Sequence, residues 1–596
     1  MPLHGGIQDE EVVTSEKVKT HRVAGRLKSA NTGDFLKSLY LVGRLTGGEV
    51  QEGAEAAGSH SDSLCTKLAK VGAAGAHRGN CHRDIMSILG KGCDRPEVYE
   101  TDVWFWDSRR KERVQKACHF LLVSEMMDYC VGRSNVEDWV GIRDNPNLQS
   151  TFETWCNKVG VNHSDADIMA LGMWGDSAVI SVSESLFILL VNCLSGIHRK
   201  RFWVCAFGKK MVCDCGCHGR HTFDSIFKVL QWDFAALKCG KIPEFRDDGI
   251  RFSESKRIGD QARHKARQKR KRFRVRGGLI QKRGDWSWHK LALGMMGWGG
   301  EGVEKRCCFK CLANFGNLSF MDFYESQLWA QTLLTHEGFM ADVIARGGYI
   351  SEIFNIPGFT HAMITADLMH CGDLGVLLYL LGIVIWEIIA EHGACLSNGQ
   401  EQIDYVLQLI RTASRQLNQA KQPVNNITMS MIRGNAKSSP KLKVKASAAR
   451  HLLLCIRLAL EKFLPMQTPH AKKRFLVVKH FCDMYHSLQN CEGLPCVQSA
   501  ATSCRRALIL WNELRQEDID PNNGNNWQTR GFFLWKLYPK HHMLQHVLED
   551  QILVSGNPVG HWCYADESEI GAAITICPTL QYSCLQTSLI RKHRLH

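Results

Sequence analysis

A long apolar run, preceded by a small group of polar residues, constrains the fold of this chain more than any other stretch. The residues from Leu374 to Trp386 are almost all apolar, and Glu387 ends the run. The run is too long for a typical strand and too short to span a bilayer comfortably, so it predicts a helix buried in a large core. Asp367 and His370 precede it at spacing i and i+3, so a helix that begins there presents both from one face. The stretch predicts a charged, metal-competent group held where water is scarce.

Length and cysteine usage bound the class of protein. The 596 residues exceed one ordinary domain, and 44% of them are apolar, so most of the chain is expected to fold. The 25 cysteines are mostly scattered singles, which suits a reducing compartment, and two tight clusters look more like metal ligands than disulfides. The N-terminus lacks the basic-then-apolar pattern of a signal peptide. We therefore expect a protein of the cytosol or nucleus with no membrane partner.

The composition of the sequence changes along the chain, and these changes predict its domains. Residues 1–80 are rich in Gly, Ala, Ser and charge and are expected to be poorly ordered. Residues 81–165 predict a small helical module, in which a short extended piece around Tyr99–Trp106 separates two helices. Residues 166–580 predict the main core, which includes a basic segment at 254–283 and a helical region at about 390–525. A basic tail, 581–596, ends the chain.

Two acids that each follow a short apolar segment predict a carboxylate site. Asp176 follows one such segment and Asp285 another. A Gly-Asp at a strand end is more often a turn or a helix cap than a metal ligand. Two acids at strand ends with a third far downstream at a helix start, however, form the arrangement that two-metal phosphoryl-transfer sites use. Mg²⁺ and Mn²⁺ favour such oxygen ligands. We favour Glu567 as the third acid; the alternatives are Glu569, Asp566 and Glu549.

The pair Cys308-x-x-Cys311 predicts a zinc site. This spacing is moderately specific for zinc, and further ligands are needed to close a tetrahedron. His370 is our candidate for the third ligand, with Cys371 or Asp367 as the fourth. The alternative is a buried thiol pair without metal, beside a helix-capping Asp and a core His.

A second cluster, Cys213, Cys215 and Cys217, also offers ligands. Alternate residues of an extended strand face the same way, so three thiolates gather on one side, with His218 as a fourth ligand after a turn. A packed turn without metal explains the spacing equally well. His542 and His546 share a helix face at i and i+4, and we favour a structural role for them.

A run of basic residues predicts an anionic partner. Between Lys256 and Arg276 the chain holds eleven Lys or Arg and one acid, against a net charge of +14 for the whole protein. A charge run is most often a solvated surface, but this many like charges repel one another and favour a polyanion such as DNA. The run also resembles a nuclear import signal, so a nuclear location is expected. The candidate DNA-binding residues are Arg267, Lys269, Arg270, Lys271, Arg272 and Arg274.

The motifs occur in a fixed order along the chain: GDSA at Asp176, CDCGCHGRHTFDSIFKVLQW, KRGDWSW at Asp285, Cys308-x-x-Cys311, Asp367-x-x-His370, YPKHHMLQH and GNPVGHWCYADE. In this order they resemble the transposase-derived proteins of dinoflagellate genomes, which are distantly similar to the CACTA and Plavaka transposases. The resemblance covers roughly residues 82–580 and rests on the series, since no one motif is specific.

This resemblance implies a fold and a function. The implied fold is mixed α/β, with a ribonuclease-H-like core, a large helical insertion and a helical N-terminal region. The implied activity is Mg²⁺-dependent DNA strand cleavage and joining, with Asp176, Asp285 and Glu567 as a DDE triad and a zinc element built from Cys and His. Many copies of such elements are decayed. The alternatives are therefore a domesticated or decayed relative that binds DNA without cutting it, and a zinc-stabilised scaffold; whether the chain forms a homo-oligomer stays open.

Overall fold

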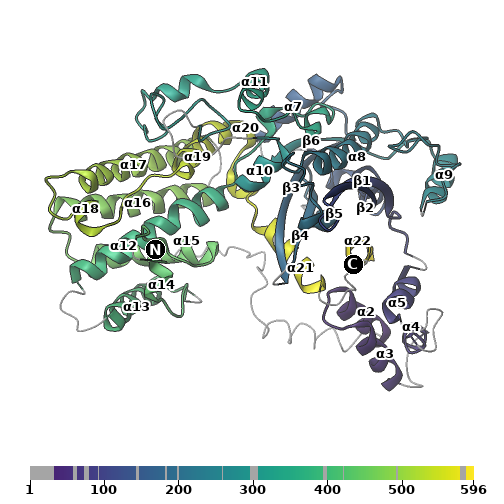
Figure 1. The fold of residues 1–596 in the computed structure, drawn as a ribbon, viewed down its shortest axis with the longest axis horizontal. Coiled ribbons are helices and arrows are strands. Elements are labelled where there is room, and N and C mark those ends of the chain that lie inside the picture. Colours follow the sequence, from purple (N-terminus) through teal and green to yellow (C-terminus); the bar gives the residue numbers. More distant parts are fainter. Residues whose placement is uncertain are drawn as a thin grey trace.

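The fold is mixed α/β, as predicted. A computed structural model describes residues 32–57, 63–72, 80–90, 93–141, 146–181, 184–197, 200–257, 259–295, 306–392, 399–419, 422–435, 437–490, 494–577 and 585–595. Among these residues, one six-stranded sheet lies beside a lobe of long helices, and a small group of short helices lies below the sheet (Figure 1).

The sheet has the strand order β1-β2-β5-β4-β3-β6. Every neighbouring pair is antiparallel except β3 and β6, which are parallel. A parallel neighbour needs a crossover, and the long helix α8 (Arg220–Cys239) lies in the connection from β5 to β6. The strands are β1 (Tyr99–Asp107), β2 (Glu112–Phe120), β3 (Ile168–Ser181), β4 (Glu184–Cys193), β5 (Arg201–Gly208) and β6 (Arg276–Arg283).

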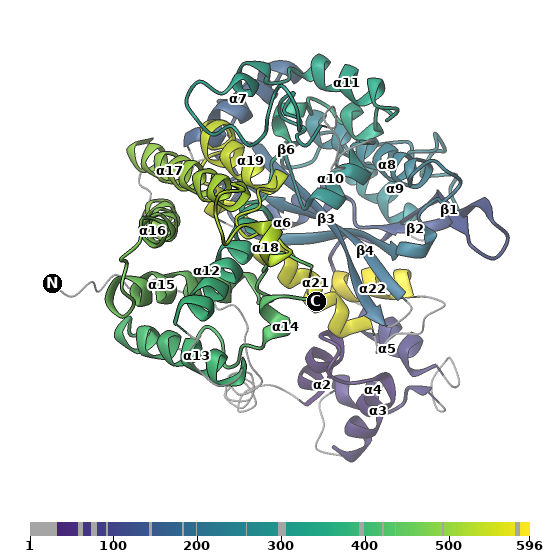
Figure 2. The same ribbon diagram turned by 60° about the vertical axis from the view of Figure 1, so that its left-hand side comes forward.

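Helices cover both faces of this sheet. Aromatic rings of α8 pack on one face, where Phe223 lies 5.3 Å from Phe187 between ring centroids. The last helix, α22 (Leu585–Leu595), packs on the other face, where His593 stacks on Trp203 at 4.3 Å between ring centroids. Figure 2 shows α8 and α22 on opposite sides of the strands. Burial on both faces explains why the central strands are almost continuously apolar.

The expected helical module at 81–165 is wrong in part, because its centre is a β-hairpin that extends the sheet. β1 and β2 pair along their whole length, and Phe120 pairs with Cys205 of β5. The piece expected to be helical after Trp106 is β2, whose first six residues are mostly exposed and polar, so that the alternation typical of a strand is hidden. The helices of this region are α5 (Cys81–Gly90), α6 (Val123–Val131) and α7 (Pro146–Val159).

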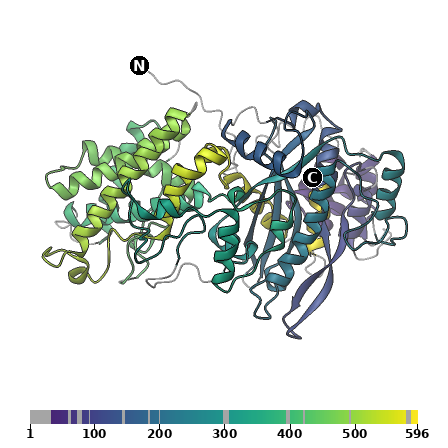
Figure 3. The ribbon, with the colours of Figure 1, turned by 90° about the horizontal axis from the view of Figure 1, so that it is seen from above.

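The apolar run forms the predicted buried helix. A π-helical stretch, Met369–Val376, continues into α12 (Leu377–His392), and most of the side chains of α12 are buried. Of the described residues, Met369–His392 is long and apolar enough to cross a membrane, yet 78% of its most apolar window is buried inside the protein, as in a core helix. Figure 3 shows the helical lobe beside the sheet. Its other long helices are α13 (Gly399–Gln416), α15 (Ala446–Lys462), α16 (Pro469–Gln489) and α17 (Leu494–Ile519).

Further helices are shorter. They are α9 (Asp260–Lys269), α10 (Trp286–Ala292), α11 (His336–Ala345), α14 (Met429–Ile432), α18 (Trp527–Arg530), α19 (Pro539–His546), α20 (Ile552–Ser555) and α21 (Tyr564–Ile576). A second π-helical stretch, Val547–Gln551, joins α19 to α20.

Short helices occupy part of the segment that was expected to be poorly ordered. They are α2 (Thr32–Leu41), α3 (Gly47–Ala56) and α4 (Ser63–Leu68), and with α5 they share a small core of their own. A capping box formed by Thr46 and Glu49 starts α3 despite its glycines. Residues 1–31 lie outside the described part of the chain.

The expected basic tail is likewise a packed helix where it is described. In α22, Leu589 and Ile590 are fully buried, and Lys592 donates to the carbonyl of Tyr40 at 2.9 Å. Two adjacent apolar residues among the basic ones give this helix an apolar face that packs into the core. The many basic residues of the segment made this face hard to recognise in the sequence.

Candidate active site and metal centre

The first predicted acid lies inside β3. Residues Ile168–Gly175 of this strand are buried, and Asp176 is half-buried at the point where the strand begins to leave the core. The apolar segment ends there, but the strand continues to Ser181 because its outer part still pairs with β4. The expected position at a strand end is therefore corrected to a position within the strand.

The second predicted acid follows the parallel neighbour of that strand. Trp174 of β3 pairs with Arg283 of β6, so Asp176 and Asp285 each lie two residues beyond one matched pair. Asp285 is also the N-cap of α10, since its Oδ1 accepts from the backbone N–H of Trp288 at 2.6 Å. Capping occupies one carboxylate oxygen and fixes the side chain beside β3.

The structure distinguishes Glu567 from the alternative third acids. Asp566 is fully buried between Arg201 and Arg283, with contacts of 2.7 and 3.1 Å. Glu569 accepts from the indole N–H of Trp203 at 2.9 Å, and Glu549 pairs with Arg505 at 2.9 Å. These three acids are therefore held in contacts with buried or half-buried partners. Glu567, in the first turn of α21, instead interacts with Asp176 and Asp285.

Burial and mutual repulsion shift the pKa values of this carboxylate group. Burial raises the pKa of Asp176 to about 6, and the Asp285 charge acts in the same direction. Burial raises the pKa of Glu567 to about 7; His370 acts in the opposite direction, and the charges of Asp176, Asp367 and Asp285 act in the same direction as burial. The charges of Asp176 and Asp285 thus act on Glu567, and the charge of Asp285 acts on Asp176. A cluster of this kind favours a divalent cation, which relieves the repulsion.

His370 belongs to the carboxylate site, which corrects its predicted place as a zinc ligand beside Cys308 and Cys311. Its Nδ1 lies 2.7 Å from Asp367 Oδ2, and its Nε2 lies 3.6 Å from Glu567 Oε1. Burial opposes the charged ring, but the hydrogen bond to Asp367 and the nearby carboxylates raise the pKa of His370. Asp367 Oδ1 also accepts from the backbone N–H of Cys563 at 2.9 Å, which ties the buried helix to the start of α21.

A cluster of four possible metal ligands forms where α19 meets the loop carrying Cys308 and Cys311. The group comprises these two thiols with His542 and His546, all fully buried. Cys311 Sγ lies 3.3 and 3.4 Å from the two Nε2 atoms, which are 3.0 Å apart. Bonds of about 2.3 Å to sulfur and about 2.0 Å to nitrogen in a tetrahedron place S and N about 3.5 Å apart and two N about 3.3 Å apart. These residues could therefore hold a metal ion such as zinc.

The surroundings of this centre match the needs of zinc ligands. The backbone N–H groups of Lys310 and Ala313 point at Cys308 Sγ and Cys311 Sγ, at 3.1 and 3.4 Å, and so stabilise thiolates. His546 Nδ1 is hydrogen-bonded to Asp550, which orients the ring so that Nε2 faces the thiols. The histidines that we expected to be structural are thus the partners of the CxxC pair. Spacing i and i+4 was the available signal, but 231 residues separate Cys311 from His542.

The predicted DNA-binding residues divide into two kinds. Arg267 pairs with Glu244 at 2.8 Å. Arg270 and Arg274 both pair with Asp128: Arg270 Nη1 lies 2.9 Å from its Oδ1, and Arg274 Nη1 lies 3.1 Å from its Oδ2. These arginines attach the segment after α9 to α6 and to neighbouring loops. The side chains that extend into solvent are Lys269, Lys271 and Arg272.

The raised carboxyl pKa values predict a pH-dependent stability. A carboxyl group whose pKa is higher in the folded than in the unfolded chain contributes stability below its ordinary pKa, and this is lost as pH rises through the folded value. For Asp176 and Glu567 that window runs from about pH 4 to about pH 7. Asp176→Asn removes one of the charges, so without added divalent metal it is expected to raise the melting temperature at pH 8 by about 1–3 °C, and by less at pH 5.

Thermal melts at the two pH values check this expectation. Added Mg²⁺ should stabilise the wild type more than Asp176→Asn, because the cation offsets repulsion that the variant lacks. An identical melting shift at pH 5 and pH 8 would show that the carboxyl group is not under electrostatic strain.

The three cysteines Cys213, Cys215 and Cys217 lie elsewhere, on the connection from β5 to α8.

Comparison with known proteins adds no family to this description, since no family model and no curated protein matches the chain.

Proposed function

We propose that this chain is a DNA strand-cleaving and strand-joining protein of the transposase type, with Asp176, Asp285 and Glu567 as its catalytic carboxylates. The observation that carries the proposal is the placement of these side chains. Asp176 and Asp285 each lie two residues beyond a matched pair on neighbouring parallel strands. Glu567 Oε1 lies 3.6 Å from His370 Nε2, and the charges of Glu567 and Asp285 both act to raise the pKa of His370. The three acids come from β3, from the turn after β6 and from α21, and Glu567 lies far beyond Asp285 in the sequence. If these acids had only separate structural roles, there would be no reason for them to be brought into one region of the fold.

The topology supports a ribonuclease-H-like core as the proposed framework. An antiparallel β3-β4-β5 meander is followed by the α8 crossover and by β6, which returns parallel to β3. The first acid lies on β3, between β4 and β6, and the second follows β6, its parallel neighbour. The helical lobe, α12 to α18, lies in sequence between the second and third acids, as the proposed insertion does. The cluster that contains Cys308 and Cys311 joins the chain before this lobe to α19, which follows the lobe, and so brings both ends of the lobe back to the sheet.

Different residues of the chain would have different roles at such a site. Asp176, Asp285 and Glu567 offer hard oxygen ligands, and two divalent ions bound there would activate the attacking oxygen and stabilise the leaving one. Asp285 is held rigid by capping α10. Asp367 fixes the ring of His370, which lies against Glu567 and balances part of the negative charge. The buried Cys308 cluster supports the same region through the continuous path from α19 to α21.

A nicking assay tests the proposal. Purified full-length protein is incubated with supercoiled plasmid and Mg²⁺, Mn²⁺ or Ca²⁺, and nicked circles are counted by gel electrophoresis. Nicking is expected with Mg²⁺ and Mn²⁺ and only weakly with Ca²⁺, whose looser coordination holds the reacting oxygens poorly in line. Binding without nicking in all three ions would favour the alternative, a DNA-binding protein without catalysis.

Exposed basic residues after α9 are the proposed contact with DNA phosphates. Replacing Lys269, Lys271 and Arg272 by Ala is expected to weaken binding to all sequences alike. It should flatten the plot of log affinity against log salt by about 2–3, since each neutralised phosphate contributes about 0.9. Fluorescence anisotropy at several salt concentrations measures the slope.

A matched control removes the same charge elsewhere. Lys437, Lys443 and Lys445 are exposed on the helical lobe, and replacing them by Ala should leave the slope nearly unchanged. Equal flattening by both triple substitutions would mean that binding depends on net charge and that the segment after α9 is no specific contact.

A further inference from the structure

A second cluster of metal-ligating side chains lies on the connection from β5 to α8 and shares no residue with the sites described above. Cys213, Cys215 and Cys217 follow β5, and His221 lies in the first turn of α8. We propose that these four residues form a second zinc site, of the Cys₃His type, which is open to solvent. It goes beyond the proposed function, because neither the carboxylate group nor the buried Cys308 cluster requires it.

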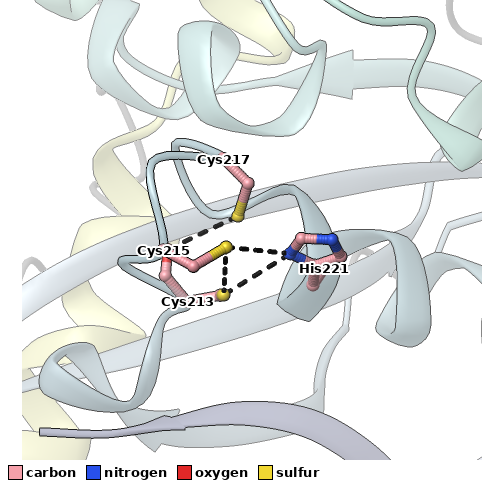
Figure 4. A group of neighbouring side chains, drawn as sticks. All are labelled: Cys213, Cys215, Cys217 and His221. Carbon is pink, nitrogen blue, oxygen red and sulfur yellow. Dashed lines mark hydrogen bonds between the residues drawn. The ribbon is translucent and has the colours of Figure 1, made fainter. Parts of the chain in front are cut away.

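The geometry of the four ligand atoms matches a tetrahedral zinc site. The Sγ atoms of Cys213 and Cys215 are 3.5 Å apart, and they lie 3.5 and 3.4 Å from His221 Nδ1. A tetrahedron with Zn–S bonds of about 2.3 Å and Zn–N bonds of about 2.0 Å has S–S edges of about 3.8 Å and S–N edges of about 3.5 Å. All four ligand atoms lie within 4.8 Å of one another. Figure 4 shows the four side chains pointing toward a common centre.

The local backbone explains why His221 and not His218 completes the cluster. Three residues of this short loop have positive φ: Gly216 and Gly219 at 87° and His218 at 50°. The left-handed turns fold the cysteine loop back over the N-terminus of α8, which begins at Arg220. His221 then follows on the helix with its ring toward the sulfur atoms. The fourth ligand that we expected from the sequence, His218, is corrected accordingly, and it lies within the turn that makes the approach possible.

The identity of the ligands selects zinc over the ions expected at the carboxylate site. Three thiols and an imidazole are soft or borderline donors, which suit Zn²⁺ and not Mg²⁺. A disulfide does not explain the cluster, because Cys213, Cys215 and Cys217 are all free cysteines. A packed apolar turn does not explain it either, since Cys215 is exposed and Cys217 and His221 are half-buried. Exposure distinguishes this site from the fully buried Cys308 cluster and predicts faster exchange of its metal.

One contact must change when zinc binds. Arg113 of β2 donates to His221 Nε2 at 3.0 Å, which leaves the imidazole proton on Nδ1. Zinc on Nδ1 requires the proton on Nε2, so the Arg113 side chain has to turn away. Arg113 is exposed, so its side chain can turn into solvent. Replacing Arg113 by Ala is therefore expected to tighten zinc binding at this site severalfold.

The proposed site lies where the end of β5, the start of α8 and the β1–β2 hairpin come together. Thr222, next to His221, donates through Oγ1 to the carbonyl of Trp104 in β1 and accepts from the backbone N–H of Cys213. Zinc at this point would fasten the end of β5, the start of α8 and the β1–β2 hairpin together. Loss of the metal is expected to loosen this junction and to leave the buried core intact.

Zinc analysis of the full-length protein, purified under reducing conditions, tests the proposal. Wild type is expected to hold two zinc ions per chain, and Cys215→Ser with Cys217→Ser one. His221→Ala should also lose the second ion. Two controls should retain both ions: His218→Asn, since Asn tolerates positive φ, and Cys239→Ser, which changes an exposed cysteine at the far end of α8. Loss of zinc from His218→Asn and not from His221→Ala would overturn the assignment.

A second measurement uses the wild-type protein alone and needs no variant to fold. Exchange of zinc for Co²⁺ gives thiolate-to-metal absorption that increases with the number of bound thiolates. The two sites together predict five thiolates for two Co²⁺, and a brief chelator treatment should remove the Cys₃His ion first. One metal per chain with the absorption of two thiolates would overturn the second site and leave the buried one unaffected.

Discussion

Replacing both Cys308 and Cys311 by Ser is expected to remove one zinc ion per chain and to lower the melting temperature by about 10 °C or more. The effect is large because a structural zinc ion in peptides contributes an apparent free energy of about 10–16 kcal/mol. Here the four ligands join the loop after α10 to α19 across 231 residues, so they close the helical lobe onto the sheet. Zinc content and thermal melts of the same preparation measure both effects.

Two further variants sharpen this prediction. Cys307→Ser changes the adjacent buried cysteine, which contacts the carbonyl of Ala313 and lies outside the cluster, so it should retain the zinc ion. Asp550→Asn keeps the ligands but weakens the support of His546, and a roughly 10- to 100-fold loss of zinc affinity is expected. If the double cysteine variant kept its zinc and its melting temperature, the cluster would be no metal centre.

Substitution of the carboxylates carries the second large expected effect. Asp176→Asn, Asp285→Asn and Glu567→Gln should each reduce plasmid nicking by about 10³-fold or more, because each removes a charged ligand while keeping the shape of the side chain. DNA binding should change little. Asn is as good an N-cap as Asp, so Asp285→Asn leaves α10 capped and separates the catalytic role from the structural one.

A control on the same helix distinguishes the third acid. Glu569 lies two residues beyond Glu567, and as Gln it can still accept the indole N–H of Trp203. Glu569→Gln should therefore nick DNA at the wild-type rate. Full activity in Asp285→Asn would mean that nicking comes from a contaminant or from other residues. Loss of activity in Glu569→Gln with full activity in Glu567→Gln would assign the third position to the wrong acid.

The sequence drew attention to the first two acids because each follows a short apolar segment, although Asp176 lies within β3 and not at its end. It could not single out the third, because four acids crowd the segments near the end of the chain. The structure separates them by partners: Asp566 forms ion pairs with two arginines and Glu569 accepts a hydrogen bond from an indole, whereas Glu567 lies 3.6 Å from His370. Such pairings form between residues hundreds of positions apart and leave no local trace in the sequence.

The metal clusters show the same limit. Cys308 and Cys311 were recognisable from their short spacing, but the histidines that complete their cluster come from α19, which packs against them only in the folded chain. His370 has suitable chemistry and a nearer position in the sequence, yet Asp367 turns it toward Glu567. The second strand of the β1–β2 hairpin was missed for a different reason, since the largely exposed β2 lacks the alternation that identifies a strand.

The most direct test of the central claim is the location of Mn²⁺ in crystals of the full-length protein soaked with this ion. Anomalous scattering at the manganese edge identifies the metal without relying on activity. The account predicts manganese bound by the carboxylates of Asp176, Asp285 and Glu567, and its loss in crystals of Asp285→Asn. Manganese absent from this group in wild-type crystals, or bound there equally well in the variant, would contradict it.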